Sequence, residues 1–480
     1  MVFRGALKKL ENSYFADRVL SRPNLLTPWI LMGEWEPLFA PVGTRLFCRM
    51  SAPPSYPLIE GFWIRNYKVF RQIAIGSSFQ QSVVMDFAGD VVPYELSPLT
   101  VFAGDTGMGK STILDAFAFL ADCVKYGINE ALTFRGGFEA VYHFNSTGPI
   151  SIGVVYRPCA EPRSMTYIVN IDYDKKTRHP FVETEAIIYR DHQPGAQPRP
   201  VLLFQNGDKQ NRLIQPWVGA QGSALDQVKR TDAMHLGLSA LAHFEDLPDI
   251  PQFSFYLNKF FISCYTSGNA VNLSPPKFKF SPTGNLAIDL KRVKDKHPSE
   301  FSGIMDVIAR QMPGVEKINL EVTEAGRTLL SFKVEGYDTV IHPAQLGEGH
   351  LRLLSLLTLF EDPIPVPLLG IEEPAAFMGH SQILAFVKTL RHHVRELGGT
   401  QFMITTSNNA LIDQMDPTEV WFLSRENNWS LRATRGLDEL QFLGIDLNSV
   451  GPFWYSDYLY HEQMQGQTPN VITDSVIQRS

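Results

Sequence analysis

The chain has 480 residues, of which 44% are hydrophobic, 19% are charged and 11% are aromatic. At roughly 150 residues per domain, this length predicts about three structural units or one large domain with insertions. The apolar fraction is typical of a globular protein and excludes intrinsic disorder as the main state of the chain. The formal net charge of −7 argues against nucleic-acid binding through bulk positive charge, although a local basic patch stays open.

The spacing of the cysteines and the hydropathy of the chain indicate in which cellular compartment the protein is expected. Cys48, Cys123, Cys159 and Cys264 lie far apart without metal-ligand spacing, so we expect reduced thiols rather than a disulfide scaffold or a zinc site. No run of about 18 apolar residues predicts a transmembrane helix. Basic residues near the N-terminus are not followed by a long apolar region or a cleavage site. We therefore expect a cytoplasmic protein with no membrane partner.

The first part of the chain leads from an extension into a strand–turn–helix unit. Residues 1–57 show weak periodicity and one candidate helix at 6–20. β-Branched and aromatic residues then alternate over 58–76, which predicts strands. A short apolar strand at 97–104 runs through a glycine-rich turn into 111–124, where apolar residues recur at helical spacing. Such a unit is typical of an α/β fold.

The rest of the chain continues to alternate strands and helices. Further strands are expected at 151–156, 165–173, 182–189, 200–204, 318–326, 328–336, 367–373, 401–407 and 419–425. Helices are expected at 233–262, 301–312, 349–360 and 381–397, with a loop rich in Pro, Ser and Gly at 267–287. No internal repeat or sustained heptad run occurs. The sequence thus predicts an α/β fold with a mixed β-sheet lobe, a compact helical insertion and no long coiled coil.

The strongest motif is the glycine-rich turn. It reads Gly104, Asp105, Thr106, Gly107, Met108, Gly109, Lys110, Ser111, Thr112 and matches G-x-x-x-x-G-K-[ST]. Its glycines let backbone N–H groups point at a phosphate, and the helix that follows adds its positive dipole end. Lys110 is expected at the β- and γ-phosphates and the Ser111 hydroxyl at Mg²⁺. A chance match is the alternative, but the flanking strand and helix favour a nucleotide site.

The second motif is acidic. It supplies the carboxylates that such a nucleotide site needs at the end of a neighbouring strand. Apolar residues fill 367–371, and Glu372 and Glu373 follow directly. Open α/β sheets bind their ligands at this carboxyl edge. We expect Glu372 on the metal side and Glu373 as the catalytic group that activates water. The alternative is a solvated strand end without function.

The order of motifs resembles the split ATPase of the ABC class. IRNYKVF, the P-loop, QLGEGHLRLLSLL, LLGIEEP and MITTSNNALID follow one another along the chain. They are similar to the motifs of RecF-like, OLD-related and structural-maintenance-of-chromosomes-like ATPases of bacteria. That group shares an I-x-N-F-K-x-F opening, an L-S-E-G-x-x-R signature, an E-E-P acidic end and a T-T-H-S-P strand end. The resemblance covers about residues 58–460, including 127–144 and 235–250.

The resemblance implies a head-type ATPase in which two molecules enclose two ATP molecules. Each P-loop would then face the signature segment of the other subunit, where Gly347, Glu348, Gly349 and Arg352 fall. ATP and Mg²⁺ are the implied cofactors, and a homodimer or higher homo-oligomer is the implied assembly. Relatives of this kind often stand beside a nuclease or another effector in anti-phage defence operons. An effector protein is therefore the implied partner, and DNA stays possible.

The sequence departs from this pattern at three places, all of which would act at the nucleotide site that the dimer completes. Gly347 stands where the signature offers a serine, Ser407 stands where the strand end offers a histidine, and 377–380 reads FMGH instead of G-L-H-P. Because loss of one hydrogen bond to a transferring group lowers rates by about 10² to 10³, the departures indicate either slow turnover or mainly ATP-dependent clamping. The interval from Lys110 to Gly347 lacks heptads and contains many prolines, which disfavours long coiled-coil arms.

The motifs predict five parts of the chain. These are an extension at 1–57, an N-terminal ATPase lobe at 58–225, a mainly helical insertion at 226–300, a C-terminal ATPase lobe at 301–450 and a tail at 451–480. Weaker signals are the cationic run Arg391, His392, His393 and Arg395, the basic stretches 277–280 and 289–297, and the aromatic run 453–460. Solvated surface explains the basic groups better than nucleic-acid contact does. The aromatic run predicts a docking edge or a core segment.

Three functions are compatible with this sequence. An ATP-hydrolysing dimer that senses or clamps something and signals to an effector is favoured. A non-catalytic, nucleotide-gated scaffold is supported by Gly347 and Ser407. A RecF-like DNA-repair ATPase would bind duplex DNA in a salt-sensitive manner. A P-loop kinase is disfavoured because it would leave the signature segment without a role.

Overall fold

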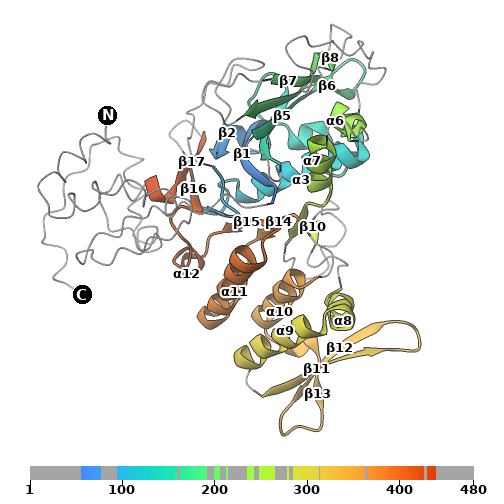
Figure 1. Ribbon diagram of the computed structural model, residues 1–480, viewed down its shortest axis with the longest axis vertical. Coiled ribbons are helices and arrows are strands. Elements are labelled where there is room, and N and C mark those ends of the chain that lie inside the picture. The colour runs from blue at the N-terminus through green and yellow to red at the C-terminus, as the bar shows by residue number, and fades with distance from the viewer. Residues whose placement is uncertain are drawn as a thin grey trace, which may run out of the picture. The chain divides into compact units, whose positions relative to one another are not determined.

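The computed structural model (Figure 1) divides the chain into two compact units, Met1–Pro54 and Ser55–Ser480. It describes residues 56–76, 95–158, 163–191, 199–205, 212–213, 235–242, 248–264, 278–279, 285–312, 314–362, 366–425 and 430–438, all in the second unit. The expected helix at 6–20, the aromatic run 453–460 and most of the loop at 267–287 lie outside these ranges, as do Cys48 and Cys159.

The first sheet is antiparallel throughout and has the strand order β2-β1-β4-β5-β6-β7-β8. Its strands are β1 (Leu58–Tyr67), β2 (Phe70–Gly76), β4 (Ile150–Arg157), β5 (Arg163–Asp174), β6 (His179–Asp191), β7 (Arg199–Gln205) and β8 (Arg212–Leu213). The expected strand region 58–76 is a hairpin, in which Tyr67 pairs with Phe70 across a tight turn. The strands predicted at 151–156, 165–173, 182–189 and 200–204 are confirmed.

The second sheet carries the motifs, in the strand order β10-β9-β14-β15-β3-β16-β17. Its strands are β3 (Leu99–Ala103), β9 (Phe261–Ser263), β10 (Phe278–Lys279), β14 (Leu368–Glu372), β15 (Gln401–Thr406), β16 (Val420–Arg425) and β17 (Leu431–Arg435). All neighbours are parallel except β16 and β17. The carboxyl ends of the parallel strands therefore meet at one edge. β15 lies between the P-loop strand β3 and the acidic strand β14, so these two strands are not direct neighbours.

Helix α3 (Lys110–Tyr126) fills the space between the two seven-stranded sheets (Figure 1). Apolar residues recur on every side of it, so Ile113, Phe117 and Leu120 are all buried in a core that includes residues of both sheets. A helix that is apolar all round is expected to be enclosed by other elements. Two short helices follow it, α4 (Ile128–Thr133) and α5 (Phe138–Val141), which the sequence patterns did not predict.

The predicted helical stretch at 233–262 is only partly helical. The structure contains α6 (Gly237–Leu241) and α7 (Asp249–Asn258), and α7 packs against α3. Phe261 and Ile262 instead belong to β9, which pairs in parallel with β14. Pairing within the sheet outweighs the helical periodicity at this end of the segment, because short apolar runs fit either structure.

The other face of the second sheet is covered by helices and a small sheet. The helices are α8 (Leu286–Lys296), α9 (Pro298–Gln311), α10 (Glu348–Phe360), α11 (His380–His392) with a π-helical end at His393–Leu397, and α12 (Asn409–Ile412). The small antiparallel sheet has the order β11 (Val315–Val322), β12 (Thr328–Val334), β13 (Val340–Ile341), and a 3₁₀ turn at Pro343–Gln345 precedes α10. Leu353, Phe386 and Phe332 join these elements in one buried cluster.

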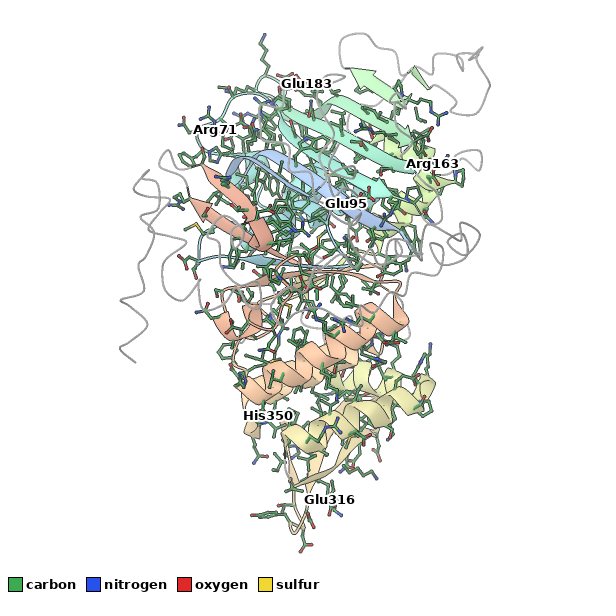
Figure 2. All side chains as sticks on the ribbon, turned by 60° about the vertical axis from the view of Figure 1, so that its left-hand side comes forward. Arg71, Glu95, Arg163, Glu183, Glu316 and His350 are labelled. Atoms are coloured by element: carbon green, nitrogen blue, oxygen red, sulfur yellow. The ribbon has the colours of Figure 1, made fainter. Side chains whose placement is uncertain are left out.

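The predicted fold class is confirmed: the described chain is an α/β fold with mixed sheets. Its longest described helix, α3, has 17 residues, so the ranges that the structure describes contain no long coiled coil. Figure 2 shows how densely the side chains fill both layers; it also labels His350 at the start of α10 and Glu316 on the small sheet. Among the described residues, no helix is long and apolar enough to span a membrane.

Candidate nucleotide site

The glycine-rich turn lies at the carboxyl end of β3 and opens directly into α3. Gly107 and Gly109 have φ values of 86° and 84°, in the left-handed region that favours glycine. A Cβ atom at Gly109 would lie 2.6 Å from the ring of Phe70, so the turn also needs glycine for lack of space. The structure thus gives the sequence motif the strand–turn–helix context that phosphate binding requires.

Lys110 is the first residue of α3, and its side chain is buried. Its Nζ donates to the carbonyl oxygens of Gly104 at 2.7 Å and Asp105 at 3.0 Å, and lies 3.6 Å from Oε1 of Glu373. Burial lowers the pKa of Lys110, while the carboxylate of Glu373 acts in the opposite direction. The ammonium group is held inside the turn, where a phosphate would meet it.

Ser111 and Glu372 come from the two motifs and meet at the same edge. The Ser111 hydroxyl donates to Oε1 of Glu372, although the residues are 261 positions apart. A hydroxyl and a carboxylate oxygen are ligands that Mg²⁺ accepts, with water and phosphate oxygens completing its shell. The residues present therefore fit the expected metal. No cluster of three or more His, Cys, Asp or Glu that could hold a metal ion occurs in the described ranges.

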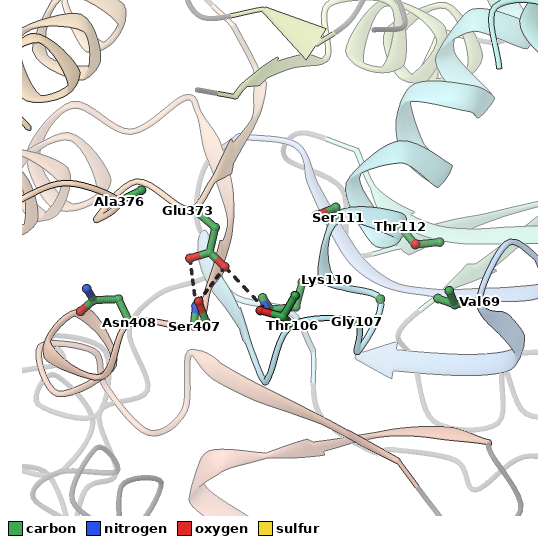
Figure 3. Close-up of a pocket in the computed structure, with 11 residues that line it drawn as sticks. Val69, Thr106, Gly107, Lys110, Ser111, Thr112, Glu373, Ala376, Ser407 and Asn408 are labelled. Carbon is green, nitrogen blue, oxygen red and sulfur yellow. Dashed lines mark hydrogen bonds and ion pairs between the residues drawn. The ribbon is translucent and has the colours of Figure 1, made fainter. Parts of the chain in front are cut away.

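Glu373 follows β14 in a strained backbone conformation. Its φ is 42°, and its N–H donates to the carbonyl of Thr405 at 2.9 Å. Both carboxylate oxygens accept hydrogen bonds from Ser407: Oε2 from the backbone N–H at 3.0 Å and Oε1 from the hydroxyl at 3.2 Å. Figure 3 shows Glu373, Ser407 and Lys110 directed at one another. The base candidate is thus oriented by the end of β15, the strand between the two motifs.

A cavity of about 600 Å³ opens between these groups (Figure 3). It is lined by Val69, Thr106, Gly107, Gly109, Lys110, Ser111, Thr112, Glu373, Ala376, Ser407 and Asn408. Its volume is within the range of about 300–1,000 Å³ that small-molecule sites have. Val69, on the turn between β1 and β2, brings an exposed apolar side chain to the rim opposite Asn408.

The signature residues divide into exposed and buried positions. Gly347 and Glu348 are exposed at the start of α10, as a contact with a second subunit would require. Gly349 is buried, and a Cβ atom there would lie 2.3 Å from the carbonyl oxygen of Phe377. Arg352 has no exposed surface and donates to the carbonyl oxygen of Glu372 at 2.9 Å. The side chain of Arg352 and the backbone at Gly349 therefore face the interior of this chain, and a contact of either residue with a partner's nucleotide stays a prediction.

Some residues of the weaker basic signals form ion pairs within the chain. Arg391 binds Glu419, and His393 lies 3.4 Å from the carboxylate of Glu361. Although burial acts against it, hydrogen bonding to Glu361 raises the pKa of His393. In the stretch 289–297, Lys291 pairs with Asp295, and Arg292 pairs with Asp289 and Asp362. These pairs agree with the interpretation of structural and solvated groups.

Sequence patterns missed the groups that support the motifs. Asp115 on α3 is buried, accepts from the Tyr67 hydroxyl at 2.7 Å and pairs with Lys68 and Arg135. This network fixes the β1–β2 turn to the P-loop helix. The signal for it in the sequence is a pair of carboxylates, Asp115 and Asp122, on a mainly apolar helix; Asp122 also pairs with Arg135. Cys123 and Cys264 are buried free thiols, as expected, and burial raises the pKa of Cys264 to about 11.

Comparison with known families and structures adds a match to the second half of the chain. Residues 288–413 match the family described as "AAA domain, putative AbiEii toxin, Type IV TA system". The matched range contains the signature segment, Glu372, Glu373 and Ser407, and it does not contain the P-loop. Over this range the chain is similar to an ATPase domain, which implies nucleotide binding and hydrolysis, usually with Mg²⁺.

Two solved structures are similar in their chain path. The SMC head domain from Thermotoga maritima is 14% identical, covers 78% of this chain and 98% of its own length, and has a TM-score of 0.33. The Smc head domain from Pyrococcus furiosus, solved with an extended coiled coil and bound to the C-terminal domain of ScpA, is 13% identical. It covers 81% of this chain and 99% of its own length, with a TM-score of 0.39. No curated protein matches the sequence.

Proposed function

We propose that this chain is a Mg²⁺-dependent ATPase that dimerises around ATP and regulates a partner effector. The observation that supports this most is the convergence of Lys110, Ser111 and Glu373 on one cavity, where the Ser111 hydroxyl also donates to Glu372, 261 positions away in the sequence. A phosphate-binding turn, an oxygen pair suited to Mg²⁺ and an oriented carboxylate are the three parts that phosphoryl transfer to water needs.

The side chains have separate roles in this proposal. Lys110 exchanges the carbonyl oxygens of its own turn for the β- and γ-phosphates, and backbone N–H groups at the start of α3 would donate to the same phosphates. Ser111 and Glu372 would hold Mg²⁺, which neutralises charge on the transferring group when bound. Glu373 orients the attacking water and accepts its proton, and Ser407 keeps the carboxylate in place.

Two variants test the nucleotide site. Lys110→Ala removes charge-assisted hydrogen bonds and is expected to weaken ATP binding about 10- to 100-fold in a calorimetric titration. Glu373→Gln keeps the metal side intact and is expected to bind ATP like the parent while hydrolysis falls about 10²- to 10⁴-fold. Lys125→Ala is the matched control, because Lys125 is an exposed lysine at the far end of the same helix. Parental ATP affinity in Lys110→Ala would refute the P-loop assignment.

The alternative of a non-catalytic scaffold is favoured by one observation. Gly347 places no hydroxyl at the start of α10, where the related signature has a serine. The contacts of Ser407 with Glu373 support catalysis instead, since they orient a carboxylate that a scaffold would not need. Release of phosphate at saturating ATP separates the two functions. Turnover that Glu373→Gln abolishes supports the ATPase, and absence of turnover in the parent supports the scaffold.

The regulation of a partner effector is the part of the proposal that is supported by similar proteins and not by the geometry of the site. The matched family is described by a toxin of a toxin–antitoxin system, and the resembling ATPases often accompany effectors in defence operons. The product of a neighbouring reading frame is the first candidate partner. Co-expression of that product with the parent, with Lys110→Ala and with Glu373→Gln tests control by nucleotide state. Identical growth and phage resistance in all three strains would argue against regulation of that effector.

A further inference from the structure

The first residues of helix α10 contact both the end of β14 and the loop that follows Glu373. At Gly349 its backbone lies against the loop that follows Glu373, so closely that a Cβ atom would be 2.3 Å from the Phe377 carbonyl oxygen and 2.8 Å from Oε1 of Gln382. One turn later, the Arg352 side chain reaches the end of β14. The start of α10 is therefore packed against the carbonyl of Glu372 and against the main chain at Phe377, which follows Glu373.

Arg352 is fully buried, yet it belongs to a segment that starts at the surface with Gly347 and Glu348. Its Nη2 donates to the carbonyl oxygen of Glu372 at 2.9 Å, and its Nη1 lies 3.4 Å from the Ser263 hydroxyl on β9. A guanidinium group stays charged and is costly to bury, so a buried arginine is retained where its fixed geometry is needed. Here its planar fork spans the carboxyl ends of β9 and β14.

The residue that Arg352 holds is the metal-side carboxylate. The main-chain carbonyl of Glu372 accepts from Arg352, while its side chain accepts from Ser111 of the P-loop. A shift of the first turn of α10 would thus move the backbone of Glu372 and, with it, the oxygen offered to Mg²⁺. Groups behind a metal ligand fix its orientation in this way and change metal affinity about 10- to 100-fold when they are altered.

We propose that Arg352 is a positioning residue that couples the exposed start of α10 to the metal ligand Glu372. It acts within its own subunit and does not touch nucleotide. The inference rests on the proposed Mg²⁺–ATP site and adds a route by which contact at Gly347 and Glu348 would reach that site. In a dimer, engagement of the α10 start by the partner would set the geometry of Glu372.

The test measures Mg²⁺ binding without relying on turnover. In Glu373→Gln protein, ATP affinity is titrated at increasing Mg²⁺, and the Mg²⁺ concentration that gives half of the affinity gain is recorded. Arg352→Lys keeps the charge but loses the planar fork. We expect it to raise that Mg²⁺ concentration about 10-fold, while ATP affinity in EDTA stays unchanged. Ser263→Ala removes the second acceptor and is expected to give a smaller shift in the same direction.

Arg292→Lys is the matched control, because Arg292 is a half-buried arginine on α8 that pairs with Asp289 and Asp362. It should lower the melting temperature without changing the Mg²⁺ dependence. If Arg352→Lys does not fold, Ser263→Ala alone decides. Parental Mg²⁺ dependence in the folded variants would overturn the inference. Failure of the Glu373→Gln parent to bind ATP would instead refute the proposed function, so the two failures are distinguishable.

Discussion

Glu373 combines a strained backbone with an oriented carboxylate. A non-glycine residue with a φ of 42° costs of order 1–3 kcal/mol, and such strain persists only where neighbours enforce it. Here the N–H of Glu373 bonds the Thr405 carbonyl, and Ser407 holds both carboxylate oxygens. The side chain is directed at Lys110, whose Nζ lies 3.6 Å from Oε1 of Glu373. The observed outlier therefore supports a functional role for this residue.

Ser407→Ala tests the orientation of the Glu373 carboxylate by removing a single hydrogen bond. The variant loses the hydroxyl donor to Glu373 but keeps the backbone N–H donor. A hydrogen bond to a charged group contributes about 1.5–3 kcal/mol, so we expect kcat to fall about 10-fold or more while ATP affinity stays parental. Ser407→Thr retains the hydroxyl and should restore turnover.

A double-mutant cycle distinguishes positioning from general damage. If Ser407 acts through Glu373, then Ser407→Ala should have no additional effect on turnover in Glu373→Gln protein. Equal rate losses in both backgrounds would show that Ser407 acts on something else. Sequence comparison presented Ser407 as a missing histidine; it could not reveal these contacts, because one of them uses the backbone N–H, which every residue type except proline offers.

Strand β1 links the P-loop helix to the first sheet through Tyr67 and also carries a buried carboxyl group. Glu60 is 2% exposed, accepts from the Ser164 hydroxyl at 2.6 Å and lies 3.2 Å from Arg157. Burial, aided by the charge of Glu95, raises the pKa of Glu60 from 4.5 to about 7. Between these values the folded protein binds more protons than the unfolded chain does. Its free energy of unfolding therefore falls as the pH rises through this range.

Glu60→Gln removes this contribution, because the amide does not ionise. In the parent, the free energy of unfolding falls by at most about 3 kcal/mol over this range, because a shift of one pKa unit corresponds to about 1.36 kcal/mol. Melting temperatures of parent and variant are measured from about pH 5 to about pH 8. The variant should gain stability relative to the parent as the pH rises. Glu324→Gln, at an exposed turn between β11 and β12, should leave the difference constant. A constant difference in Glu60→Gln would contradict the raised pKa.

Periodicity predicted most helices and strands of this chain. It did not predict which groups their polar side chains contact. Alternation found the strands of the first sheet, and the 3.6-residue period found α3, α10 and α11. It gave the wrong structure at Phe261 and Ile262, where pairing with β14 decides. The motifs identified Lys110 and Glu373, but the strand order, with β15 between them, depends on contacts distant in sequence. That order is what gives Ser407 its place.

The P-loop follows β3 of the second sheet, and α10, which carries the signature residues, contacts the carboxyl end of β14 in the same sheet. Gly347 and Glu348 are exposed at the N-terminus of α10, a helix of 13 residues, while the rest of the first turn is packed inside its own subunit. The N-terminus of a helix attracts anions through its free N–H groups and dipole. A second subunit that brings a bound phosphate to this exposed start would complete the proposed dimer.

Gly347 allows this dimer to be tested without disturbing the fold. Gly347 is the residue before α10, with a φ of −65°, and the nearest atom to a Cβ there is Nδ1 of His350 at 3.5 Å, an ordinary contact. Aspartate and serine are both favoured at such a position, so either should keep α10 intact. Gly347→Asp adds negative charge where the partner's phosphate is expected, whereas Gly347→Ser adds only a hydroxyl.

We expect Gly347→Asp, in Glu373→Gln protein with Mg²⁺ and ATP, to stay monomeric in sedimentation measurements while still binding ATP. Repulsion between the carboxylate and the phosphate, in a site with little water, is the physical reason. Gly347→Ser should dimerise at least as well as the parent, because its hydroxyl can donate to the phosphate. Dimers of equal stability in both variants would show that the start of α10 does not face bound ATP. The two subunits would then meet through another surface.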